Sequence, residues 1–294
     1  MRKIVFFTVI IALIYSCMPA TESKHLTYQN IVIISDMSSR IENKRFPQKD
    51  ISEIHNIIKY FRDECVKPGE KIGDKSCIRF SAFSEKIAAS IDIGEIKDLG
   101  EKQKFINSTG KFQNCGLDKE LLDFENKVVG LYDKISNPGL DLISILIEKI
   151  ENESIVKSNK VISDGIDSTY IHFENHIYIF TDGYLEYQLS QKKLNGEYYF
   201  GEPEIERVRQ YCIINNLDVP TALEKKKSLG LPVSNIKQSK DINLHVFETH
   251  ERDKDVKSQT YKHNTGLRDN EILKAVWEKW AKESGFKSFE WKKY

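Results

Sequence analysis

The sequence has no excess of charge of either sign, because 44 lysine and arginine residues balance 44 aspartate and glutamate residues. Nucleic-acid-binding proteins present a basic face, so this balance argues against a nucleic-acid partner. It also gives the protein no electrostatic reason to lie against anionic lipid. The sequence contains neither an internal repeat nor a low-complexity tract, which excludes repeat architectures and compositionally biased chains.

Several catalytic and zinc-binding motifs are missing as well. The chain has no G-x-S-x-G elbow, no G-x-x-x-x-G-K loop and no H-E-x-x-H helix, which speaks against three large enzyme classes. It has no C-x-x-C pair, so a structural zinc site is not expected. His245, Glu248 and His250 are close in sequence, but a strand there puts His245 and Glu248 on opposite faces. We interpret these three as polar residues at a strand end.

Cysteines are few. After Cys17 the chain has four, at positions 65, 77, 115 and 212. In an exported protein, four cysteines can form two disulfides with three possible pairings, and sequence alone does not choose among them. Cys77 lies in a strand pattern and Cys65 near a helix end, so buried free thiols are the alternative.

Only one long apolar run is present, and it lies at the N-terminus. Arg2 and Lys3 precede Ile4 to Tyr15, which is too short for a membrane span of about 20 residues but typical of a secretory signal. The run ends in Ile14-Tyr15-Ser16-Cys17, which resembles the lipobox of bacterial lipoproteins.

That resemblance implies a signal peptide over residues 1–16 and lipidation, for example with palmitate, at Cys17. We expect residues 17–28 to form a tether, and the protein to lie in the bacterial cell envelope, touching the membrane only through its lipid. An ordinary signal peptide or a buried N-terminal helix is the alternative.

Strand and helix patterns alternate along residues 29–294. Apolar strand patterns occur at 31–35, 77–83, 176–181 and 242–248, and helical spacing occurs at 51–61, 117–135, 140–150, 203–214 and 269–285. This alternation predicts one three-layer, Rossmann-like α/β domain with a mostly parallel sheet and helices on both faces. The stretches 184–201 and 215–241 fit the pattern poorly and are predicted to be insertions.

Two acidic loops directly follow buried strand patterns. Asp36-Met37-Ser38-Ser39-Arg40 follows Ile31 to Ile34, and Thr181-Asp182-Gly183 follows Ile177 to Phe180. In an open α/β sheet, ligands bind at the carboxyl ends of the strands. Carboxylates and hydroxyls are hard oxygen ligands suited to Mg²⁺, Mn²⁺ or Ca²⁺. We therefore expect Asp36 and Asp182 to meet at one edge of the sheet.

This arrangement resembles the von Willebrand factor A domain, whose metal-ion-dependent adhesion site combines Asp-x-Ser-x-Ser, a threonine and a Thr-Asp-Gly-like turn. Asp36 and Ser38 match the first motif and Asp182 matches the last. The segment Asn137 to Ile143 resembles the family's Gly-Thr-Asp-Leu segment, with Phe80 to Phe83 in the place of its second strand. The resemblance spans roughly residues 29–250.

Two positions depart from the family pattern. Arg40 stands where the second serine would be, and Leu140 stands where the threonine would be. One consequence is a partly hydrated ion held by Asp36, Ser38 and Asp182, with Asp141 as a further ligand. Another is that Arg40 pairs with Asp36 or Asp182 and replaces the ion. The third possible consequence is a site that holds neither an ion nor the Arg40 side chain.

The leading functional interpretation is a lipid-anchored binding module rather than an enzyme. The resemblance implies a protein partner bound through the top of the sheet, with a divalent cation taking part. One alternative is a metal-assisted phosphoester hydrolase, although Ser38 occupies the place of the second aspartate that such an enzyme of the haloacid-dehalogenase type would use. The other is a structural envelope protein whose acidic turns only cap helices.

Aromatic residues gather just after Asp182, at Tyr184, Tyr187, Tyr198, Tyr199 and Phe200. They could form a lid that contacts a partner, but packing of the segment onto the domain is the favoured interpretation. Trp277 and Trp280 lie on an apolar helix face, which predicts that they are buried.

Overall fold

The computed structural model of the protein describes residues 23–38, 45–70, 74–82, 86–134, 139, 141–163, 167–187, 198–248, 250–255, 257–263 and 266–293. The chain divides into two contact units. The smaller unit takes in Ser158–His172 and the N-terminal residues up to Thr27, and the larger one holds the rest. The predicted signal peptide, Cys17, Arg40 and Leu140 lie outside the described residues.

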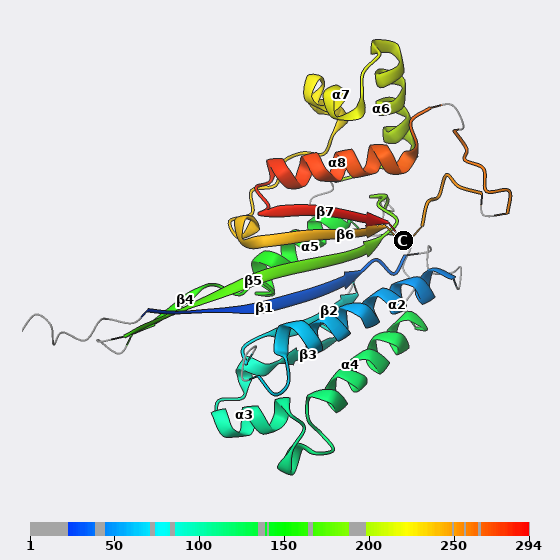
Figure 1. Cartoon of the computed structure of the whole chain (residues 1–294). Helices are drawn as coiled ribbons and strands as arrows, with labels where there is room; N and C mark the ends of the chain where they lie inside the picture. Colours follow the sequence, from blue (N-terminus) through cyan, green and yellow to red (C-terminus); the bar gives the residue numbers. More distant parts are fainter. Residues whose placement is uncertain are drawn as a thin grey trace, which may run out of the picture. The chain divides into compact units, whose positions relative to one another are not determined.

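A mostly parallel sheet carries the fold, as the sequence predicted (Figure 1). Its strands are β1 (Ser23–Ser35), β2 (Cys77–Ala82), β3 (Ala89–Asp92), β4 (Lys160–Ser163), β5 (Ser168–Thr181), β6 (Ile242–Glu248) and β7 (Ser288–Lys293). They are ordered β3-β2-β1-β5-β6-β7, with β4 paired to β5. β3 and β4 pair antiparallel to their neighbours, whereas β1–β2, β5–β6 and β6–β7 are parallel.

Helices cover both faces of the sheet, which makes a three-layer α/β domain. They are α2 (Arg45–Tyr60), α3 (Leu99–Ile106), α4 (Leu117–Tyr132), α5 (Leu142–Asn152), α6 (Glu202–Asn215), α7 (Val219–Lys225) and α8 (Asp269–Glu283). A π-helical turn, η2 (Phe61–Val66), continues α2. Helices α2, α3 and α4 pack on one face, and α5, α6, α7 and α8 pack on the other (Figure 1).

The apolar run in β1 explains why this strand is central. Side chains alternate between the two faces of a strand, so Ile31 and Ile33 join the core under α2 while Val32 and Ile34 join the core under α5. A strand buried on both faces needs apolar residues at every position rather than at alternate ones. The same holds for β5, where Ile177 and Ile179 face α5 and Phe180 faces α2.

Residues 23–28 were predicted to be part of a tether, but they form the first part of β1. Within the smaller unit, His25 stacks on Tyr170 of β5, with ring centroids 4.7 Å apart. Strand β5 is likewise longer than its apolar run predicts, because it starts at Ser168. The first residues of β5 pair with β4 in an antiparallel hairpin, Lys160 opposite Ile171 and Ser163 opposite Ser168. This backbone pairing orders a stretch that has no apolar run.

The two predicted insertions contribute to the core. Val219, Ala222 and Leu223 of α7 are buried in the cluster under α8. In the other stretch, Tyr184, Tyr198 and Phe200 are buried in the same cluster, which confirms the packing interpretation for these three aromatic residues. The predicted burial of Trp277 and Trp280 is also confirmed.

The four described cysteines are free thiols rather than disulfide partners. Cys65, Cys77 and Cys212 are buried and Cys115 is exposed. Burial raises the pKa of Cys65 to about 12, so this thiol stays protonated at neutral pH. Across the described residues, every helix falls short of the length and apolar character that a membrane span needs.

Candidate functional site

The two predicted acidic loops meet at the carboxyl edge of the sheet, where β1 and β5 end side by side (Figure 1). The backbone N–H of Asp36 donates to the carbonyl of Phe180 over 2.8 Å. The hydroxyl of Thr181 donates to Asp36 Oδ2 over 3.3 Å. Asp36 and the Thr181-Asp182-Gly183 turn therefore share one small region, as the sequence predicted.

Asp36 is buried, and it organises its own loop. The backbone N–H of Ser38 donates to Asp36 Oδ1 over 3.1 Å, and Ser38 is buried too. Directly before it, the hydroxyl of Ser35 lies 2.6 Å from that of Tyr132, which in turn donates to Asp50 Oδ2 over 2.9 Å. The end of β1 is thus tied to α2 and α4 by buried hydrogen bonds.

Asp182 pairs with an arginine that sequence analysis did not select. Its Oδ1 accepts from the backbone N–H of Tyr184 over 3.2 Å, and its Oδ2 accepts from Arg252 Nε over 2.7 Å. Another guanidinium nitrogen of Arg252 forms an ion pair with Glu186. The guanidinium lies 4.1 Å from the centre of the Tyr184 ring. We call these four residues, Asp182, Tyr184, Glu186 and Arg252, the Arg252 clamp.

The turn after Asp182 requires glycine. Gly183 has a φ of +87°, a conformation that other residues rarely adopt. A Cβ placed there would lie 2.7 Å from the Trp291 ring. The backbone carbonyl of Gly183 accepts from Trp277 Nε1 over 2.8 Å, which ties the turn to α8. The Gly183 backbone therefore lies against the Trp291 and Trp277 rings, and this close packing fixes the turn that carries the Asp182 side chain.

Asp141 lies at the N-terminus of α5, where it acts as a helix cap. Its Oδ1 accepts from the backbone N–H of Ser144 over 3.0 Å, and its Oδ2 accepts from the Ser144 hydroxyl over 2.7 Å. Gly139, two residues before it, lies against the clamp, because a Cβ there would be 2.5 Å from the carbonyl oxygen of Glu186. Asp141 is therefore near the predicted site, but its carboxylate serves the helix.

Two further acids at the same edge were missed. Glu248 ends β6, lies beside Thr181 in the register and is only 1% exposed. Trp291 Nε1 donates to its carboxylate over 2.9 Å, and burial raises the pKa of Glu248 to about 7. Behind the clamp, Asp269 accepts from the Tyr184 hydroxyl over 2.7 Å and pairs with the buried Arg209.

A signal for Arg252 and Glu248 was present in the sequence. Both lie at or just after the carboxyl end of a predicted strand, 242–248, and a parallel sheet brings such ends to one edge. Taken as a local cluster, His245, Glu248 and His250 indicate only polar residues at a strand end. The predicted placement of His245 and Glu248 on opposite faces is confirmed, because His245 contacts Glu290 whereas Glu248 contacts Trp291.

The described ligand set does not suit a divalent ion in this arrangement. Both oxygens of Asp182 accept hydrogen bonds, one of them from a guanidinium that already supplies the positive charge. Among the residues that the structure describes, no three or more His, Cys, Asp or Glu side chains are grouped so as to hold a metal ion. The metal set of Asp36, Ser38, Asp182 and Asp141 stays a prediction, and so does the pairing of Arg40.

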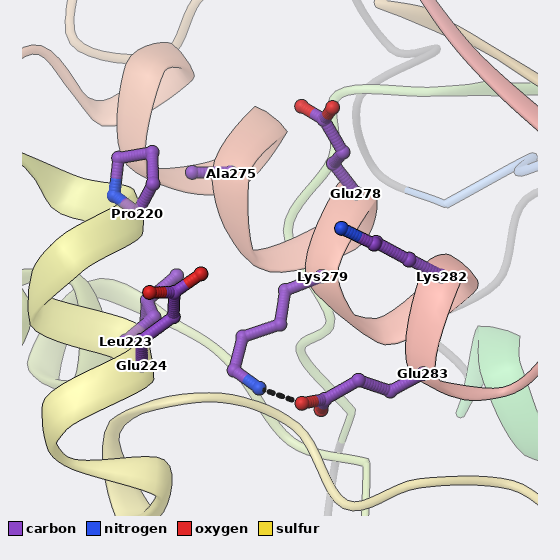
Figure 2. Close-up of a pocket in the computed structure, with 8 residues that line it drawn as sticks. All are labelled: Pro220, Leu223, Glu224, Ala275, Glu278, Lys279, Lys282 and Glu283. Atoms are coloured by element: carbon purple, nitrogen blue, oxygen red, sulfur yellow. Dashed lines mark hydrogen bonds and ion pairs between the residues drawn. The ribbon is translucent and has the colours of Figure 1, made fainter.

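Two hollows lie near α8. One, of about 400 Å³, lies between α7 and α8, and Pro220, Leu223 and Ala275 line it together with charged side chains of both helices (Figure 2). Lys279 and Glu283, one turn apart on α8, form an ion pair at its rim. The other, of about 320 Å³, includes Arg209 and Asp269 from the network behind the clamp. The charges that line both hollows are of mixed sign.

Neither a scan against protein-family models nor a search of curated proteins finds a match for this chain. The site is therefore defined by its own geometry. It is the carboxyl edge of a mostly parallel sheet, where the buried Asp36 and the Thr181-Asp182-Gly183 turn lie together and Arg252 pairs with Asp182.

Proposed function

We propose that the protein is a lipid-anchored lipoprotein of the bacterial cell envelope whose von Willebrand factor A-like domain binds a protein partner. The partner docks at the carboxyl edge of the sheet, around the Arg252 clamp. The sequence before residue 23 supports the anchor, through its short apolar run and Cys17. The clamp supports the binding surface.

One observation carries the binding role: an arginine and a tyrosine, Arg252 and Tyr199, are exposed above a buried aspartate, Asp182. The Arg252 side chain is 32% exposed while its partner Asp182 is 1% exposed. Beside it, Tyr199 is 39% exposed, and its ring packs edge-on against Tyr187 with centroids 5.6 Å apart. Arginine and tyrosine are enriched among the residues that dominate protein interfaces.

Preorganisation favours binding at this surface. Arg252 is held by Asp182, Glu186 and the Tyr184 ring. A partner that meets a guanidinium already fixed in place loses little side-chain entropy on binding. Because Asp182 and Glu186 already balance the charge of the guanidinium, the expected partner presents neutral acceptors such as backbone carbonyls, with apolar surface that packs on Tyr199.

The hydrolase alternative has less support. A nucleophilic or metal-binding Asp36 would have to present a carboxylate oxygen to substrate, but both of its oxygens accept hydrogen bonds from the protein and the residue is buried. Asp182 is committed to Arg252. If the protein were only a structural component of the envelope, the exposed Arg252 and Tyr199 side chains would have no role.

A photo-crosslinking residue at position 199 tests the binding role in the native envelope. We expect it to capture a protein that the same probe at position 122 does not, because Leu122 is comparably exposed but lies on α4, outside the clamp. Capture at 199 should fall at least tenfold when Tyr187 is also replaced by alanine. Identical capture from positions 199 and 122 would refute the proposal.

Calorimetry with Mg²⁺ and Mn²⁺ tests whether the edge needs an ion. Because Arg252 supplies the positive charge beside Asp182, we expect no saturable heat from the wild-type protein at millimolar ion. Saturable heat that disappears in Asp36→Ala would instead establish the predicted ion at this edge. The partner would then dock beside a bound ion, and the proposed docking surface itself would stay the same.

A further inference from the structure

A three-stranded ribbon lies within the smaller unit, and it is made of residues 23–27 of β1, all of β4 and residues 168–172 of β5. β5 is its middle strand, because both β1 and β4 pair with it. On the β4 side, Val161 lies opposite Tyr170. On the β1 side, the His25 ring stacks on the Tyr170 ring. Backbone pairing and ring stacking thus give the ribbon a defined arrangement of side chains.

Apolar side chains of the ribbon are exposed on both of its faces. All four residues of β4 are exposed, with Val161 at 61% and Ile162 at 55%, and Tyr170 of β5 is 41% exposed. Consecutive side chains of a strand point to opposite faces, and residues opposite each other on paired strands share a face. Val161 and Tyr170 therefore lie on one face, and Ile162 lies on the other. Exposed apolar groups that gather in one place mark a contact site.

The first residue of β1 lies level with the end of the β4–β5 hairpin. His25 is level with Tyr170, and a side-chain hydrogen bond joins β1 and β5 again four residues further along each strand. The two strands therefore run parallel in one register, which places Ser23 beside Ser168. Ser168 pairs with Ser163, the last residue of β4. The chain thus enters the ribbon at the same end as the exposed apolar residues of β4.

We propose that this end of the ribbon enters the interfacial region of the bilayer that anchors the protein, as a second membrane contact beside the lipid. The inference rests on the proposed lipid anchor. Cys17 is six residues before Ser23, and an extended residue spans about 3.5 Å, so Ser23 lies at most about 21 Å from a lipidated Cys17. A tether this short gives the ribbon a high local concentration at the bilayer, which populates a contact too weak to form in dilute solution.

The placement of the apolar groups favours a bilayer over a flat protein surface. A protein that docks on one face of the ribbon would cover Val161 but leave Ile162 in water. Lipid surrounds the end of a ribbon on both faces, so both side chains leave water together. Tyrosine is enriched at the membrane–water interface, which suits Tyr170. At this depth the outer backbone groups of β4 still bond to water and headgroups, as they could not in the hydrocarbon core. Because the contact is apolar, it needs no anionic lipid and agrees with the balanced charge of the chain.

Tethering to vesicles tests the ribbon without the native lipid. The chain from residue 18 onward carries an N-terminal hexahistidine tag, which binds a nickel-chelating lipid in phosphatidylcholine vesicles. It also carries Cys115→Ser, because Cys115 is the exposed thiol among the described cysteines. Ser163→Cys takes an environment-sensitive fluorophore and leaves Val161 and Ile162 in place. We expect tethering to raise the emission about threefold, and a lipid-borne quencher to reduce it, because the label leaves water. Val161→Ser combined with Ile162→Ser should abolish both changes.

A label at Leu122→Cys is the matched control, because Leu122 is 52% exposed but lies on α4, outside the smaller unit. Its emission should be the same with and without tethering. The proposal is overturned if the label at position 163 does not respond, or if the label at position 122 responds equally. A dimer in sedimentation velocity that Val161→Ser with Ile162→Ser dissociates would assign the ribbon to a second copy of the chain and overturn it as well. Incorporation of labelled palmitate at Cys17 in cells tests the anchor separately, so failure of the anchor and failure of the ribbon contact are distinguishable.

Discussion

Arg252→Ala is expected to lower the free energy of unfolding by about 3 kcal/mol, because it leaves the Asp182 carboxylate buried without its cation. Asp182 is 1% exposed in the intact pair, so its carboxylate depends on the guanidinium rather than on bulk water for charge balance. The substitution also removes the contact between the guanidinium and the Tyr184 ring and the ion pair with Glu186. Urea unfolding at pH 7 measures the difference.

Two further variants show whether the buried charge is the cause. Asp182→Asn combined with Arg252→Ala should recover much of the loss, since an amide tolerates the missing cation and the two sites are coupled. Arg207→Ala is the matched control, because its guanidinium pairs with Glu204 at 2.8 Å but is 64% exposed. It should cost less than about 1 kcal/mol. Equal losses for Arg252→Ala and Arg207→Ala would contradict the clamp.

Glu248→Gln is expected to stabilise the protein at pH 8, by up to about 3 kcal/mol. Burial raises the folded-state pKa of Glu248 from 4.5 to about 7. The folded protein therefore keeps a proton that the unfolded chain releases, so the stability contributed by Glu248 falls as pH rises from 4.5 to 7. A glutamine is neutral throughout, and its oxygen can still accept from Trp291 Nε1.

The measurement is the difference in unfolding free energy between Glu248→Gln and the wild type, at pH 5 and at pH 8. Taking the difference cancels His176, whose lowered pKa reduces stability as pH falls from 6.5 towards 4. Glu120→Gln, at an exposed position of α4, controls for the loss of one negative charge. A difference that does not grow between pH 5 and pH 8 would show that Glu248 is ionised in the folded protein.

Much of the fold followed from short-range patterns. The run Ile31 to Ile34 predicted a strand covered on both faces, and the helical spacing of Ile54, Ile57 and Ile58 predicted the buried face of α2. Edge strands were harder to predict. Neither β4 nor β7 carries a continuous apolar run, because their side chains are mostly exposed and their order comes from backbone pairing with β5 and β6.

The sequence by itself determined that Asp36 and Asp182 lie at one edge of the sheet. Each directly follows a strand that is apolar on both faces, and parallel strands end on the same side. Only the tertiary structure decided what neutralises Asp182. An ion pair between residues 70 positions apart depends on how the loop after β6 folds back, and neither residue type nor spacing encodes that path. The same reason applies to His176 and His245, which become neighbours only through the register of two strands.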